Sequence, residues 1–146
     1  FVVLDLPSHW GEWVGHVLAM ADEAVVTSML DLTCLRDAQN VLRQINEERG
    51  EDRKAWVVLN QAGRSKKTEL SEKDFESVTE DRLALTLAYD PILFGTASNN
   101  GQPIGEVNAR SKGAASFKEL ARRLSGRHVA SKRKKKGPFS FLPGGK

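Results

Sequence analysis

Short, unbroken apolar runs recur along this chain, separated by stretches whose apolar residues recur every three or four positions. An apolar run without polar alternation is typical of a strand buried on both faces of a parallel sheet. The predicted strands cover residues 1–7 (FVVLDLP), 23–29, 55–59 and 83–88. The predicted helices cover 8–21, a long stretch capped by Asp31 or Thr33 and ending at Glu48, and 111–125, with shorter helices that begin at Ser71 and at Asp90-Pro91. Strands that alternate with helices in this way form right-handed parallel crossovers. The sequence therefore predicts an α/β fold of three layers, in which helices flank a mainly parallel sheet.

Polar residues and glycines mark the expected ends of these helices. Asp90 followed by Pro91 is a strong helix start, because the proline fits the first turn and the carboxylate caps it. Ser71 with Asp74 three residues later resembles a capping box. Gly50 is expected to end the helix of residues 31–48.

The charge of the chain is divided unevenly between its body and its last twenty residues. Residues 127–146 contain seven basic residues and no acid, which leaves 15 basic against 19 acidic residues in positions 1–126. Prolines and glycines in the same twenty residues would break any helix. We therefore expect one mildly acidic domain at 1–126 and a basic, disordered tail at 127–146.

The composition also limits where the protein is expected to work. Cys34 is the single cysteine, so an intramolecular disulfide is impossible and a reducing compartment is the natural expectation. No apolar run approaches the roughly 20 residues of a membrane-spanning helix, and no signal-peptide pattern is visible. We expect a cytoplasmic protein, either free or peripheral at the inner face of the cell membrane.

Polar side chains follow three of the predicted strands. Asp5, Asn60 and Asp90 with Pro91 stand where a parallel sheet presents its ligand-binding edge. The alternative is that each residue only starts or stops its own element, and capping would suffice for Asp90. No GxxxxGK[ST] loop, HExxH pair or GxSxG elbow is present, so no complete catalytic motif can be assigned.

Several blocks in a fixed order resemble the second half of a MinD/ParA-type ATPase. These are FVVLDLP, AVVTSMLDLTCLRDAQNVL, WVVLNQAG and LAYDPILFGTASNNGQPIGEV. The second and fourth blocks are similar to the CpaE/TadZ group of Flp (Tad) pilus assembly proteins. The resemblance covers residues 1–126 and implies a partial P-loop NTPase domain.

This resemblance assigns roles to individual residues. Asp5 would belong to the Walker B element and help to hold magnesium through water, which suits the hydration that magnesium retains. Asn60 would read the edge of adenine, since a carboxamide offers both a donor and an acceptor. Tyr89, Asp90 and Pro91 would pack beside the base.

The phosphate-binding loop of the family lies upstream of the Walker B strand, and this chain lacks that motif. We therefore expect ATP and magnesium to bind a longer protein that carries this chain. Without the loop amides and lysine, the 146-residue chain alone is expected to bind neither and to be inactive.

By resemblance, the expected function is pilus assembly or protein localisation, with a homodimer and pilus assembly or secretion components as partners. A non-catalytic positioning scaffold at the membrane and a ParA-like DNA partitioning protein are the alternatives. The tail could contact an anionic membrane, bind nucleic acid non-specifically, or remain solvated, and nucleic acid is the less favoured partner. The residues expected to contact a membrane are Lys132, Arg133, Lys134, Lys135, Lys136, Phe139 and Phe141.

Overall fold

The computed structural model describes residues 1–7, 11–65, 67–79 and 83–126. In chain order the elements are α1 (Glu12–Met20), β1 (Val25–Met29), α2 (Leu32–Arg49), the 3-10 helix η1 (Glu51–Arg53), β2 (Trp56–Ala62), α3 (Glu72–Thr79), β3 (Leu83–Ala88), α4 (Pro91–Asn100), α5 (Ile104–Val107) and α6 (Lys112–Leu124). The basic tail predicted at 127–146 lies outside the described residues. Within the described ranges, no helix is both long enough and apolar enough to cross a membrane.

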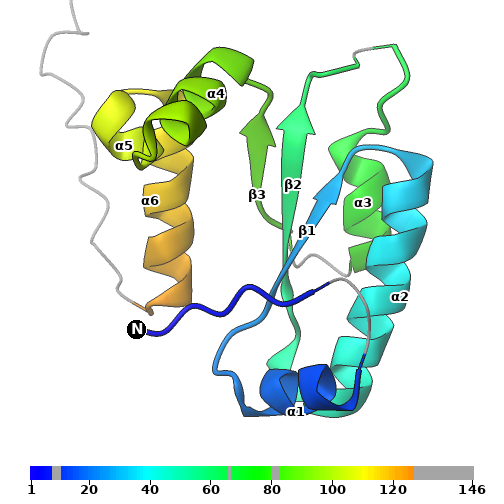
Figure 1. Cartoon of the computed structure of the whole chain (residues 1–146). Helices are drawn as coiled ribbons and strands as arrows, with labels where there is room; N and C mark the ends of the chain where they lie inside the picture. Colours follow the sequence, from blue (N-terminus) through cyan, green and yellow to red (C-terminus); the bar gives the residue numbers. More distant parts are fainter. Residues whose placement is uncertain (8–10, 66, 80–82, 127–146) are drawn as a thin grey trace, which may run out of the picture.

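The three strands form one parallel sheet in the order β1-β2-β3. Val25 pairs with Trp56 at the start of β1, and Met29 pairs with Asn60 at its end. Helices α2 and α3 cover one side of the sheet, while α6 lies on the other side together with α4 and α5 (Figure 1). The predicted α/β fold with a parallel sheet between helices is confirmed.

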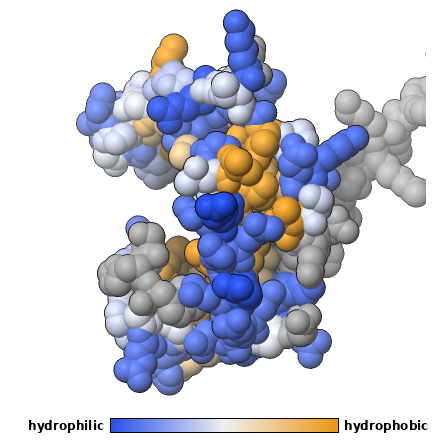
Figure 2. Space-filling model, turned by 90° about the vertical axis from the view of Figure 1, so that its right-hand side faces the viewer, coloured by the Kyte–Doolittle hydropathy of each residue, from blue (hydrophilic) through white to orange (hydrophobic). Residues whose placement is uncertain are grey.

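Alternation along β2 divides the core between the two faces of the sheet. Val57 and Leu59 are fully buried against the α2 and α3 side, in a cluster with Leu30 and Phe75. Val58 points the opposite way and packs in a second cluster, to which α6 contributes Leu120. The outer surface on the α2 side is hydrophilic over most of its extent, with the largest apolar area near the middle and smaller ones elsewhere (Figure 2).

A third cluster closes the amino-terminal end of the sheet. Val14 and Leu18 of α1 meet Ile45 of α2 there, together with Ala24 and Ala55, which precede β1 and β2. This cluster fixes α1 across the end of α2.

The strand predicted at residues 1–7 is wrong. The segment has no regular secondary structure, and Phe1, Val2 and Val3 are 100%, 87% and 92% exposed. It makes no backbone hydrogen bond with the described part of the chain. It runs in front of the strands in the view of Figure 1, and Leu6 packs on the α1–α2 cluster. An apolar run becomes a strand only where a neighbouring strand accepts its hydrogen bonds, and composition alone does not supply that neighbour.

Most predicted boundaries hold, with three differences. The first helix begins at Glu12 after the N-cap Gly11, whereas Ser8, the expected start, lies outside the described residues. Strand β2 continues to Ala62, so Asn60 lies inside the strand and not after it. The short helix α5 was not predicted, because its four residues are too few to show a helical period.

Candidate functional site

The carboxyl ends of the three strands meet at one edge of the sheet, because all three strands are parallel. Two backbone hydrogen bonds tie the loops at this edge together. The Tyr89 N–H donates to the carbonyl of Ala62 at 2.8 Å, and the Leu70 N–H donates to the carbonyl of Leu30 at 2.9 Å. Residues that are far apart in the sequence therefore form one continuous surface, as expected for the binding edge of an α/β sheet.

Asn60 supplies an available donor at this edge. Its side chain is partly buried near the end of β2, and Oδ1 accepts a hydrogen bond of 2.9 Å from the Gln61 N–H. The Nδ2 group has no hydrogen-bond partner among the described residues. A half-buried amide with unused donors is suited to reading the edge of a ligand.

Asp90 and Pro91 set the start of α4. The Leu93 N–H donates to Asp90 Oδ1 at 2.9 Å, and Pro91 occupies the first turn. The capping interpretation of Asp90 is therefore confirmed, and this cap fixes the backbone that follows Tyr89. Tyr89 itself is 44% exposed.

Arg64 lies beside Tyr89, and sequence reasoning missed it. The Arg64 guanidinium carbon is 5.9 Å from the centroid of the Tyr89 ring, within cation–π range. Its Nη1 donates to Gln61 Oε1 at 2.8 Å. Gln61 lies inside β2 with φ 58°, a left-handed conformation at the point where the β2–β3 register is irregular, between Leu59 and Ala62. The sequence signal was a basic residue soon after a strand end, but nothing local pairs that residue with a tyrosine in a later loop.

Glu69 holds the turn that presents Arg64. Its carboxylate accepts hydrogen bonds from the Gly63 N–H at 2.8 Å and the Ser65 N–H at 2.7 Å. The N–H groups of Ser65 and then Gly63 lower the pKa of Glu69 below its ordinary value. Glu69 therefore stabilises this turn as an anion.

An open cavity of about 250 Å³ lies beside the turn, where β1 ends and α2 begins. It is lined by residues 29–31, Gln61, Arg64, Ser65, Thr68 and Glu69. Asp31 is occupied there as the N-cap of α2: it accepts from the Cys34 N–H at 2.7 Å, and that bond lowers the pKa of Asp31. The lining is mixed, with Met29 and Leu30 beside the polar residues, and both of its carboxylates, Asp31 and Glu69, already accept hydrogen bonds from the backbone.

Asp5 is not brought to this edge. Its neighbour Leu6 packs on the cluster at the amino-terminal end of the sheet, and Asp5 is exposed. In the described part of the chain, no group of three or more His, Cys, Asp or Glu side chains could hold a metal ion. The magnesium role of Asp5 stays a prediction, in which water and phosphate oxygens would be the other ligands.

A parallel α/β sheet with a polar carboxyl edge defines the class of protein, one in which ligands bind where the strands end. No family model matches the sequence. Over 132 residues the chain is 22% identical to the septum site-determining protein MinD of Bacillus subtilis (strain 168), covering 88% of this chain and 48% of that protein. The chain is thus homologous, at low identity, to MinD, a member of the MinD/ParA ATPase superfamily.

Two solved structures share the fold. The MinD cell division protein of Aquifex aeolicus gives a TM-score of 0.64 at 22% identity, over 80% of this chain and 49% of that chain. The MinC:MinD cell division protein complex of the same organism gives 0.63 at 23% identity, over 77% and 46%. The chain spans about half the length of the relatives it matches, and the narrower CpaE/TadZ resemblance stays a prediction.

Proposed function

We propose that the protein carrying this chain is a MinD/ParA-like ATPase of the CpaE/TadZ pilus assembly and localisation type. In this proposal the carboxyl edge of the described sheet binds the adenine base of ATP. The observation that carries it is the unused Nδ2 donor of Asn60, at the edge where the Tyr89–Ala62 hydrogen bond joins the chain after β3 to the end of β2. Homology to MinD supports the choice of nucleotide as ligand.

Each residue of the edge has a defined task in this proposal. Asn60 donates from Nδ2 to the base. Its Oδ1 already accepts from the Gln61 N–H, so it accepts from the base either with its second lone pair or by giving up that bond. Asp90 and Pro91 hold the backbone beside the base through the start of α4. Asp5 would face magnesium in the longer protein, where ATP and water would supply the remaining ligands.

The wider role follows from the same resemblance. We propose a homodimer that works with pilus assembly or secretion components in the cytoplasm, at the inner face of the cell membrane. The basic tail would contact anionic lipid through its cations and aromatic side chains. The non-catalytic scaffold stays the alternative, because the described residues contain neither a phosphate-binding loop nor a metal cluster.

The test measures nucleotide binding by the natural full-length protein that carries this chain. Binding of a fluorescent ATP analogue is followed by anisotropy, and ATP and GTP are compared as competitors. Asn60→Ala should weaken the binding of ATP about tenfold, because the base loses a hydrogen bond from a neutral amide and its edge is left unpaired. The affinity for GTP should change much less, so the preference for ATP over GTP should fall.

Asn40→Ala is the matched control, since Asn40 is an exposed amide on the outer side of α2. It should leave both affinities unchanged. The absence of ATP binding by the unaltered protein would favour the scaffold. Unchanged ATP affinity in Asn60→Ala would remove Asn60 from the site.

A further inference from the structure

We propose that Arg64 is a further base-binding residue, whose guanidinium rests on Tyr89 and covers one flat side of the bound adenine. This inference rests on the proposed function and adds to it a residue from a different loop. In this inference Arg64 stacks on the base, while Asn60 forms hydrogen bonds with the edge of the base.

The first support is the way the guanidinium is held. Its carbon lies over the Tyr89 ring, 5.9 Å from the centroid, and Nη1 donates to Gln61 Oε1 at 2.8 Å. Gln61 is the residue directly after Asn60, and its N–H is bound by the Asn60 side chain. The proposed base reader and the proposed stacking residue therefore share one short segment of backbone.

The second support is that hydrogen bonds within the chain hold the turn. Glu69 accepts from the Gly63 and Ser65 N–H groups on either side of Arg64, and the Tyr89 N–H bonds to Ala62. Both members of the Arg64–Tyr89 pair are thus anchored by backbone contacts. Bonds within the chain that fix the pair lower the entropic cost of binding a ligand to it.

The third support is the chemistry of the exposed side. Arg64 is exposed, and it forms no ion pair with any acid in the described part of the chain. A guanidinium is planar and weakly hydrated, so it stacks on aromatic systems in a way that an ammonium group cannot. A purine offers such a flat surface.

A phosphate contact is the competing role for an unpaired arginine, and lysine separates the two. Lysine keeps the positive charge and can bind a phosphate, but it loses the planar stacking surface. Arg64→Lys should therefore behave like Arg64→Ala if the guanidinium covers the base. It should behave like the unaltered protein if the charge meets a phosphate.

The experiment uses the natural full-length protein with a bound fluorescent ATP analogue, displaced either by adenosine or by inorganic tripolyphosphate. Arg64→Ala and Arg64→Lys should each lower the affinity for adenosine about fivefold and leave the affinity for tripolyphosphate unchanged. Arg43→Ala, which removes an exposed arginine from α2, is the control and should change neither. Far-UV circular dichroism and thermal unfolding check that every variant folds.

The outcomes separate this inference from the function on which it rests. If the unaltered protein binds the ATP analogue and Asn60→Ala weakens it, but adenosine displaces equally well from both Arg64 variants, only the role of Arg64 is overturned. A loss confined to tripolyphosphate in Arg64→Ala would likewise overturn it, in favour of a phosphate contact. If the unaltered protein does not bind the analogue, the proposed function fails and the inference fails with it.

Discussion

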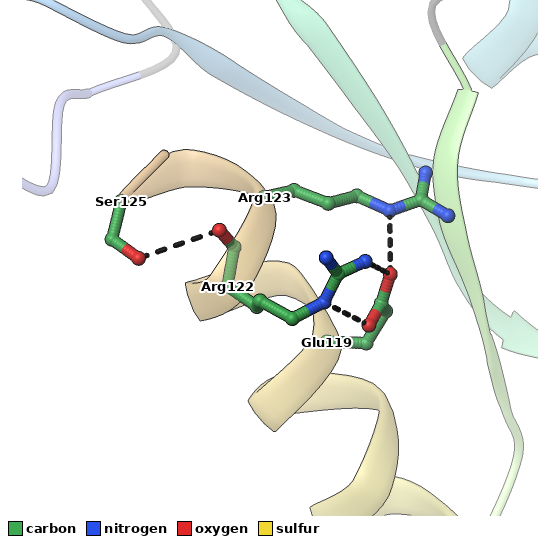
Figure 3. A network of polar contacts seen from close by, with 4 residues as sticks. All are labelled: Glu119, Arg122, Arg123 and Ser125. Carbon is green, nitrogen blue, oxygen red and sulfur yellow. Dashed lines mark hydrogen bonds and ion pairs between the residues drawn. The ribbon is translucent and has the colours of Figure 1, made fainter. Parts of the chain in front are cut away.

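At the scale of single residues, the clearest electrostatic feature is the Glu119 carboxylate near the end of α6. Arg122 Nε donates to Glu119 Oε2 at 2.8 Å, Arg122 Nη2 donates to Oε1, and Arg123 Nε donates to Oε1 at 3.1 Å (Figure 3). The arginines also lie in the last helical turn, where positive charge interacts favourably with the helix dipole. The hydrogen bonds from Arg122, then those from Arg123, lower the pKa of Glu119 to about 2.

This arrangement predicts a pH dependence with a definite sign. Because the pKa of Glu119 falls on folding from its ordinary 4.5 to about 2, the stabilisation is complete above pH 4.5 and is lost as the pH falls toward 2. The stability difference between the unaltered chain and Glu119→Gln should therefore shrink across that window. Urea unfolding at a series of pH values measures it, and carbon NMR of the Glu119 carboxyl gives the pKa directly. A carboxyl midpoint near 4.5 would contradict the prediction.

At the scale of elements, α1 depends on arginines from outside it. The last turn of α1 contains no basic residue, and its carbonyl groups would lack partners. Arg49, which is 5% exposed, donates to the carbonyls of Leu18 and Ala21 at 2.7 Å, and also to those of Asp22 and Arg53 at 2.9 Å. Arg53 adds a bond of 3.1 Å to the carbonyl of Ala19.

Removing Arg49 should therefore loosen α1 from the end of α2. Arg49→Ala removes the donor of the buried Leu18 carbonyl and of three partly buried hydrogen bonds, and should lower the free energy of unfolding by about 3 kcal/mol. Arg49→Lys should recover only part of this loss, because the single nitrogen of an ammonium group cannot reach all the carbonyls that the three nitrogens of the guanidinium bind. Urea unfolding monitored by tryptophan fluorescence provides the measurement.

Arg43→Ala is the comparison, since Arg43 is exposed on the same helix and should cost about 0.5 kcal/mol or less. Equal losses for Arg43 and Arg49 would show that the cluster of carbonyl contacts adds nothing to the stability of α1.

Elements whose ends carry local signals were predictable from sequence. The Ser71–Asp74 capping box is present, with Asp74 Oδ2 accepting from the Ser71 N–H at 2.8 Å and Ser71 Oγ accepting from the Asp74 N–H at 3.3 Å. Asp90 with Pro91 starts α4, and Gly50 ends α2 at φ 78° as expected. A helix cap depends only on residues three or four positions apart, so it can be predicted from the local sequence.

At the scale of the whole molecule, features that depend on contacts between distant segments were not predictable. The 1–7 segment has the composition of a strand but no strand beside it in the described structure. Arg49 reads in the sequence as a surface residue at a helix end, and only the position of α1 makes it buried. Arg64 meets Tyr89 only because their loops are joined at the sheet edge. The sequence therefore predicted Asn60 at this edge of the sheet but not its neighbour Arg64, and the role of Asn60 toward a base stays a prediction.

The last prediction concerns ATP hydrolysis by the 146-residue chain on its own. Its sheet edge offers donors and a flat surface suited to a base, but its sequence contains no glycine-rich lysine loop to hold a triphosphate. Phosphoryl transfer depends on such a loop and on magnesium, because positioning and charge stabilisation supply nearly all of its catalysis. The purified 146-residue chain should therefore release no phosphate from ATP above the buffer rate, with a MinD protein as positive control. Release that requires magnesium and is lost in Asn60→Ala would show that the chain builds its phosphate site by another route.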